Sequence, residues 1–212
     1  MCFSAKISIL TFIIGFVSSF LCFTLGKVID KIIGLFFAFI SLMQIIEYLL
    51  WNHQICDNYN RIVSICGMIL NHMQPVILGI IILLINTSLK KRWLIKLIII
   101  IYLFFIVPYS IQFINNKDIQ CTIKNKKHLE WKWNSMKYYT LIYFIYILTL
   151  SLIFIVGLPT IKLGIFASFY AVFTYLTSSY FYSDGSIGAL WCFYILLTPL
   201  IYYFLRISVF SR

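Results

Sequence analysis

The sequence predicts an all-α fold, a bundle of seven transmembrane helices. Of its 212 residues, 62% are hydrophobic and only 11% are charged, whereas a soluble domain has about 45–50% apolar and about 25% charged residues. Apolar runs of about 20 residues recur with short polar breaks, and a helix needs about that length to cross a bilayer. Since the runs are continuous and do not alternate with polar residues, a transmembrane β-barrel is excluded, as is a water-soluble globule.

Seven apolar segments meet the length requirement. They cover residues 7–25, 32–51, 62–85, 97–114, 138–157, 161–181 and 187–205. The first is expected to be a retained signal anchor, because its apolar run is too long for the core of a signal peptide. The fifth and sixth are separated only by Leu158, Pro159 and Thr160, which requires a tight hairpin. The longest connection is 115–137, so we expect a single integral membrane domain over residues 1–212.

The basic residues predict that the N-terminus lies outside and the C-terminus in the cytoplasm. In this orientation the inner segments carry nine Lys or Arg residues, against Lys6 and Arg61 in the short outer segments, which follows the positive-inside rule. The nine are Lys27, Lys31, Lys90, Lys91, Arg92, Lys96, Lys162, Arg206 and Arg212. The connection 115–137 places six lysines outside and opposes the assignment, but longer loops can translocate regardless of charge.

The cysteines differ in what their positions permit. Cys56 and Cys121 lie in the second and fourth connections, both outside, where an oxidising compartment permits a disulfide. Two free thiols are the alternative, since the sequence does not show how close the sulfur atoms come. Removal of Met1 leaves Cys2 at the N-terminus, as a nucleophile or as an ordinary terminal residue. The cysteines inside spans, expected to be small packing residues, are Cys22, Cys66 and Cys192.

Polar side chains inside lipid are costly, so they are the best indicators of function in this sequence. In the second span, polar and aromatic residues at i, i+3 and i+4 spacing form one helical stripe. The stripe contains Ser41, Gln44, Glu47, Tyr48 and Trp51. In the third span, Asn71, His72 and Gln74 precede Pro75, which cannot donate to the carbonyl of Asn71.

We expect Glu47 and His72 to belong to one polar network, although their depths differ by about 9 Å. Gln44, Asn71 or a water would bridge them. Two interpretations stay open: interhelical hydrogen bonding that only holds helices together, or a polar site between the second and third spans for binding or transfer of a small molecule, lipid or proton. The proposed site residues are Gln44, Glu47, Trp51, Asn71, His72 and Gln74. One His and one Glu fall short of the ligands that zinc needs, so no metal and no cofactor are expected.

Three segments carry a resemblance to a known family. The opening Met-Cys-Phe-Ser-Ala, the segment from Gln44 to Trp51 and the run Asn-His-Met-Gln-Pro ending at Pro75 resemble an uncharacterised family of multi-pass membrane proteins found in giant viruses and bacteria. The resemblance extends to about Pro75. It implies a viral membrane protein with a shared site at Cys2, Gln44, Glu47 and Trp51, and it implies no reaction. An enzyme using Cys2 or Glu47 is therefore an open alternative.

A seven-helix signalling receptor, similar to G-protein-coupled receptors, is the other alternative. The segment from Thr198 to Tyr202 is similar to the receptor NPxxY signature, and a link between Cys56 and Cys121 would mimic the receptor disulfide. Against it, the third span ends without a DRY-like motif and the inner loops are short. A retinal protein is excluded because the seventh span has no lysine, and ceramidase-like zinc hydrolases because no histidine follows His128.

The composition also limits the partners. The lipid bilayer is the expected partner, with a small molecule or lipid as ligand, and no soluble partner is evident. No nucleic-acid binding is expected, because the positive charge flanks the spans instead of forming a domain face. Trp131 and Trp133 in the basic connection are expected at the lipid head groups, beside lysines attracted to anionic lipid.

Overall fold

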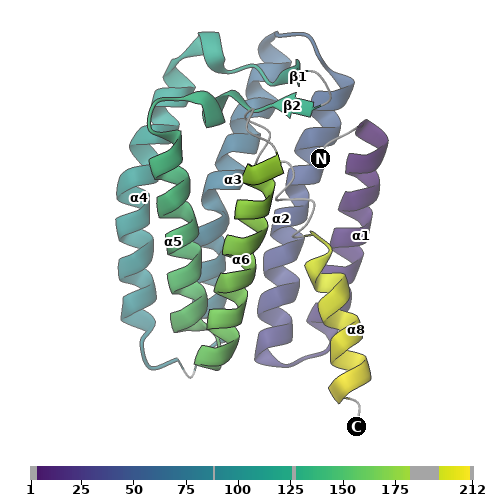
Figure 1. Cartoon of the computed structure of the whole chain (residues 1–212), viewed down its shortest axis with the longest axis vertical. Coiled ribbons are helices and arrows are strands. Elements are labelled where there is room, and N and C mark those ends of the chain that lie inside the picture. Colours follow the sequence, from purple (N-terminus) through teal and green to yellow (C-terminus); the bar gives the residue numbers. More distant parts are fainter. Residues whose placement is uncertain (1–3, 88, 126–127, 182–195, 211–212) are drawn as a thin grey trace.

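The computed structural model describes residues 4–87, 89–125, 128–181 and 196–210, which form an all-α bundle (Figure 1). Its helices are α1 (Ala5–Thr24), α2 (Val28–Asn52), α3 (Asn58–Ile85), α4 (Arg92–Asn115), α5 (Tyr139–Gly157), α6 (Ile161–Phe181) and α8 (Thr198–Phe210). Helices α1 to α6 stand side by side and alternate in direction. Helix α8 packs against α1 and α2, so the first and last described helices are neighbours. The predicted all-α class is confirmed.

Helices α1 to α6 are long and apolar enough to cross a membrane. Their outer faces expose large apolar side chains, such as Phe104 at 76% and Phe166 at 67%, as expected where lipid is the solvent. Part of the predicted seventh span, 187–205, lies outside the described residues. The described part belongs to α8, whose 13 residues rise about 20 Å, less than the roughly 30 Å of a hydrocarbon core. Seven spans therefore stay a prediction.

The observed helices extend past the predicted spans at their polar ends. Both α2 and α3 begin four residues before the apolar segments 32–51 and 62–85. Asp30 Oδ2 accepts from the Lys27 N–H (3.0 Å), and Asp57 Oδ1 accepts from the Asn60 N–H (3.0 Å). Such caps satisfy N–H groups that a helix leaves open at its start, and hydropathy does not detect them. In the turn before α2, Gly26 has φ +89°, which glycine adopts without strain.

The connection between α4 and α5 folds over one end of the bundle, and we call its described residues, 116–125 and 128–138, the cap (Figure 1). The cap contains η1 (Lys117–Ile119), β1 (Ile123–Asn125), β2 (His128–Glu130) and η2 (Lys132–Ser135). The strands pair antiparallel, with Ile123 opposite Glu130. The cap therefore lies over the end of the bundle at which α3 and α5 begin.

Trp131 and Trp133 anchor the cap in the interior. Both side chains are 0% exposed, and their ring centroids lie 4.8 Å apart. Trp133 also meets the ring of Phe113 edge-on, with 5.8 Å between centroids. Both indoles therefore contact protein, whereas they were expected at the lipid head groups. Their lysine neighbours made the segment look like an interfacial loop, whereas the fold turns both indoles inward.

Candidate functional site

The residues predicted for the polar site lie inside the bundle. Glu47 and Asn71 are 0% exposed, and Gln44, His72 and Gln74 are at most 3% exposed. Trp51, at the cap end of the α2 stripe, is only partly buried, and the Lys124 ammonium of the cap lies 5.9 Å from its ring centroid. The helical stripe that sequence spacing predicted therefore does face protein.

The close approach of α2 and α3 sets the heights of these residues. A Cβ added to Gly67 of α3 would lie 2.9 Å from Ile46 Cγ2 of α2, so the α3 backbone packs directly against the Ile46 side chain there. The helices run in opposite directions, and each residue rises about 1.5 Å. Gln44 and Asn71 therefore differ by only about 3 Å in height.

We call the buried residues Gln44, Glu47, Asn71, His72 and Gln74 the polar layer. Two tyrosines of α5 complete it. Asn71 Nδ2 donates to the Tyr143 hydroxyl (3.2 Å), which itself donates to Asn134 Oδ1 of the cap (2.6 Å). The Tyr146 hydroxyl donates to Gln74 Oε1. Neither tyrosine was among the residues predicted for the site. Their i, i+3 spacing in an otherwise apolar span was the available signal, since it puts both hydroxyls on one face.

His72 faces helix α4. Its Nδ1 lies 2.9 Å from Ser110 Oγ, and its ring packs against that of Tyr109 at 5.8 Å between centroids. Tyr102 of α4 donates its hydroxyl to the His72 carbonyl (2.8 Å), next to the Asn71 carbonyl that Pro75 leaves without its helical donor. The expected bridge from Glu47 to His72 is not among the hydrogen bonds of the described residues.

Several buried polar atoms of the layer make no hydrogen bond within the described part of the chain. They are Gln44 Nε2, Asn71 Oδ1, His72 Nε2 and Gln74 Nε2. A buried polar group without a partner costs about 1–3 kcal/mol. The layer therefore offers both donors and an acceptor to a further molecule. Among the described residues, no three His, Cys, Asp or Glu side chains gather in a way that holds a metal ion.

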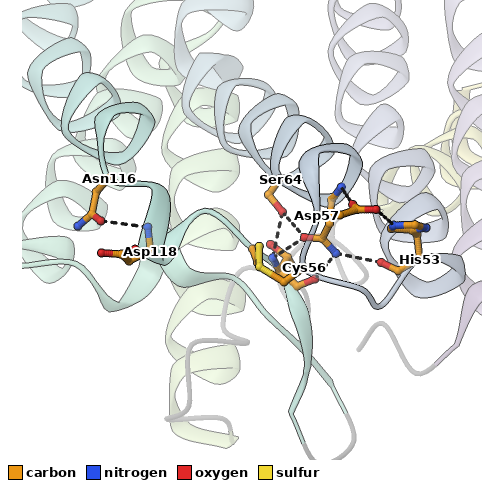
Figure 2. Close-up of a disulfide and its surroundings, with 9 residues drawn as sticks. His53, Cys56, Asp57, Ser64, Asn116 and Asp118 are labelled. Carbon is orange, nitrogen blue, oxygen red and sulfur yellow. Dashed lines mark hydrogen bonds and ion pairs between the residues drawn. A yellow bond between two sulfur atoms is a disulfide. The ribbon is translucent and has the colours of Figure 1, made fainter.

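The cap is fastened to the start of α3 by a disulfide and by one side-chain amide. Cys56 and Cys121 form the disulfide, with 5.5 Å between their Cα atoms. Beside it, Asn60 Oδ1 accepts from the Thr122 N–H (2.9 Å) and Asn60 Nδ2 donates to the Thr122 carbonyl (3.0 Å). Figure 2 shows these bonds around the disulfide, with Ser64 Oγ as a second acceptor for the same N–H (3.1 Å).

The turn between α2 and α3, which carries Cys56, is ordered by a charged side chain. Asp57 Oδ2 lies 2.8 Å from His53 Nε2 (Figure 2), and its other oxygen caps α3. The bond from the Asn60 backbone N–H, followed by the His53 side chain, lowers the pKa of the Asp57 carboxyl below its usual value. The carboxylate is thus the form that stabilises this turn and, through it, the attachment of the cap to α3.

The cap also reaches the polar layer directly. The Tyr109 hydroxyl donates to the Trp133 carbonyl (2.5 Å), and Trp133 lies 3.5 Å from the position of a Cβ added to Gly67. The layer is therefore covered from the cap side by an indole, and from the same side by Asn134.

A search for related proteins found no matching family model, curated protein or solved structure.

Proposed function

We propose that this chain is a seven-span integral membrane protein that binds a small molecule or lipid in the polar layer between α2, α3 and α5. The observation that carries the proposal is the set of buried amide atoms with unused hydrogen-bonding capacity on Gln44, Asn71 and Gln74. Glu47, Trp51 and His72 border the same layer as site residues. We also propose membership of the giant-virus and bacterial family that begins Met-Cys-Phe-Ser-Ala.

Hydrogen-bond donors without an acceptor favour a ligand-binding site over contacts that only hold helices together. Polar residues that only join helices give each donor an acceptor on a neighbouring helix, as Tyr146 does with Gln74 Oε1. The amide nitrogens of Gln44 and Gln74 lack such an acceptor among the described residues. A bound molecule with an acceptor oxygen would remove this cost, and the energy so gained contributes to its affinity.

The proposed orientation places the N-terminus and the cap outside. The cap and the beginning of α1 lie at the same end of the bundle in Figure 1. A disulfide persists only in an oxidising compartment, so the Cys56–Cys121 pair favours the outer side for this end. The basic turns at the opposite end agree with the positive-inside rule.

A signalling receptor is the second candidate. The disulfide that ties the α4–α5 connection to the start of α3 favours it, since receptors of the G-protein-coupled kind have a similar bridge. The turns at the other end, Leu25–Lys27 and 158–160, are too short to form a docking surface for a G protein. An enzyme that uses Cys2 depends on a residue outside the described part of the chain. Intramembrane binding is therefore preferred.

Mass spectrometry of the native protein in mild detergent tests the binding proposal. The wild-type chain is expected to carry an adduct of constant mass that Gln44→Leu or Asn71→Leu removes. Ser18→Ala is the matched control, because among the described residues this buried hydroxyl bonds only to carbonyls of its own helix, and it should keep the adduct. Identical spectra for the wild type and both site variants would contradict the proposal and leave the polar layer as helix-packing contacts.

A further inference from the structure

A cavity lies directly beside the polar layer, on the side away from the cap. Its volume is about 240 Å³, and α2, α6 and α8 enclose it against α3 and α5. For comparison, a cavity of about 150 Å³ holds benzene. The walls are almost wholly apolar, with Phe36, Leu150 and Ala167 among the lining residues. A hydrocarbon group is therefore the matching occupant for its main volume.

The cavity is placed to receive a molecule from the lipid. Three of its lining residues, Phe166 of α6 and Ile201 and Leu205 of α8, are 67%, 53% and 56% exposed. Helices α6 and α8 stand on either side of α2 in Figure 1. Exposed apolar side chains in a membrane bundle face hydrocarbon, so this wall of the cavity borders the bilayer.

One end of the cavity carries a hydrogen-bond donor. Gln74 lines this end, is 1% exposed, and receives the Tyr146 hydroxyl at its Oε1. With its oxygen engaged, the side chain keeps Nε2, which is buried without a hydrogen-bond partner in the described residues. An amide N–H needs an acceptor oxygen. The site therefore selects a molecule whose oxygen lies at the end of an apolar chain.

The charges near the cavity are already neutralised. Asp30, at the inner end of α2, accepts from the Tyr202 hydroxyl (2.5 Å) and lies 3.4 Å from Arg206 Nε. At the height of α8's first turn, Thr198 Oγ1 donates to the Tyr170 hydroxyl (3.2 Å). A charged head group next to Gln74 would lose its hydration without gaining a countercharge among the cavity-lining residues described. An uncharged head group carries no such penalty.

We propose that this cavity binds an uncharged lipid, with its hydrocarbon chain between α2, α6 and α8 and an ester or hydroxyl oxygen at Gln74 Nε2. The inference deepens the proposed function and rests on it, because Gln74 belongs both to the polar layer and to the cavity wall. It names the ligand class as a neutral acyl ester or long-chain alcohol that enters sideways from the membrane.

Photolabelling of the full chain in phospholipid nanodiscs tests this inference. The probes are a hexadecanoic methyl ester with a mid-chain diazirine and the corresponding free acid at pH 8. The ester is expected to label peptides of α2, α6 and α8, and excess unlabelled ester should compete with it. The acid should label these peptides several-fold less. Equal labelling by both probes, or no competition, would overturn the inference.

Two variants separate a built site from ordinary lipid contact. Ala167→Phe fills the cavity and should abolish competed labelling, whereas Ile100→Phe, at a 64% exposed position of α4, should leave it intact. Gln74→Leu should weaken labelling roughly two- to tenfold, the effect of one hydrogen bond. Labelling unaffected by Ala167→Phe would refute the cavity as the binding place. That failure is distinct from failure of the proposed function, which is read from the adduct that Gln44→Leu removes.

Discussion

Tyr143 connects the polar layer to several parts of the structure. Its hydroxyl accepts from Asn71 and donates to Asn134, and its ring stacks on that of Tyr175 of α6, with 6.0 Å between centroids. One side chain thus links α3, α5, α6 and the cap. Removing a single oxygen from it tests whether these contacts stabilise the fold.

Tyr143→Phe is expected to lower the free energy of unfolding by about 1–3 kcal/mol, because it leaves the buried Asn71 amide without its acceptor. The ring stays in place, so packing with Tyr175 is kept. Denaturant unfolding in detergent micelles measures the change. Tyr138→Phe is the control, since this side chain is 62% exposed. Equal stability of the Tyr143 variant and the wild type would show that the hydroxyl network contributes nothing.

Gly67 allows α2, α3 and the cap to approach one another. Gly67→Val is expected to destabilise the protein by about 1–3 kcal/mol through overpacking, because an added Cβ would already lie 2.9 Å from Ile46. Trp133 should also move, which intrinsic fluorescence detects as a shift of the emission maximum. Cys66→Val, at the neighbouring exposed position, should change neither quantity. An unshifted spectrum for the Gly67 variant would contradict the close packing of the indole.

At the scale of elements, the cap depends on the Cys56–Cys121 disulfide that ties it to the start of α3. The disulfide closes a loop with a sequence separation of 65 residues, and loop entropy assigns such a bridge about 4 kcal/mol. Replacing Cys56 and Cys121 by serine should lower unfolding stability by that order, whereas Cys66→Ser should not. Alkylation of the unreduced protein, read by mass spectrometry, should leave Cys56 and Cys121 unmodified. Full modification of both would show that the bridge does not form.

The stability of the turn that carries Cys56 should depend on pH through the Asp57 carboxyl. Its pKa is lower in the folded chain than in the unfolded chain, so the carboxylate stabilises the fold at pH values above its unfolded pKa of about 3.9. As the pH falls through the lower folded pKa, this contribution disappears. The wild type should therefore have a higher melting temperature than Asp57→Asn at pH 7, and the difference should begin to shrink as the pH falls below about 4 and vanish once the pH lies below the folded pKa. A difference that is constant with pH would refute this role.

At the scale of the whole molecule, the orientation is open to a direct test. Lys127→Thr creates a glycosylation sequon at Asn125, an exposed residue of the hairpin. With the cap outside, expression in a eukaryotic host should attach sugar there, seen as a mass increase that a glycosidase removes. Asn125→Gln in the same background is the control. Sugar on the native sequon at Asn86, at the opposite end of the bundle, would reverse the proposed topology.

The sequence alone determined the helical class, the positions of six apolar helices and the burial of Gln44, Glu47, Asn71, His72 and Gln74. These properties are local, since hydropathy over about 20 residues decides whether a helix prefers lipid, and helical spacing decides which side chains share a face. The disulfide pairing of Cys56 with Cys121 was only one of two alternatives at that level, because loop length does not report the distance between two sulfur atoms.

Only the tertiary structure decided which helices each polar residue meets. His72 and Asn71 are adjacent in the chain, yet one turns to Ser110 of α4 and the other to Tyr143 of α5, because neighbouring helical residues point about 100° apart. The inward turn of Trp131 and Trp133 and the cavity at Gln74 likewise depend on contacts between distant segments. Helix rotation and loop closure are set by packing against partners far along the chain, and no local pattern records them.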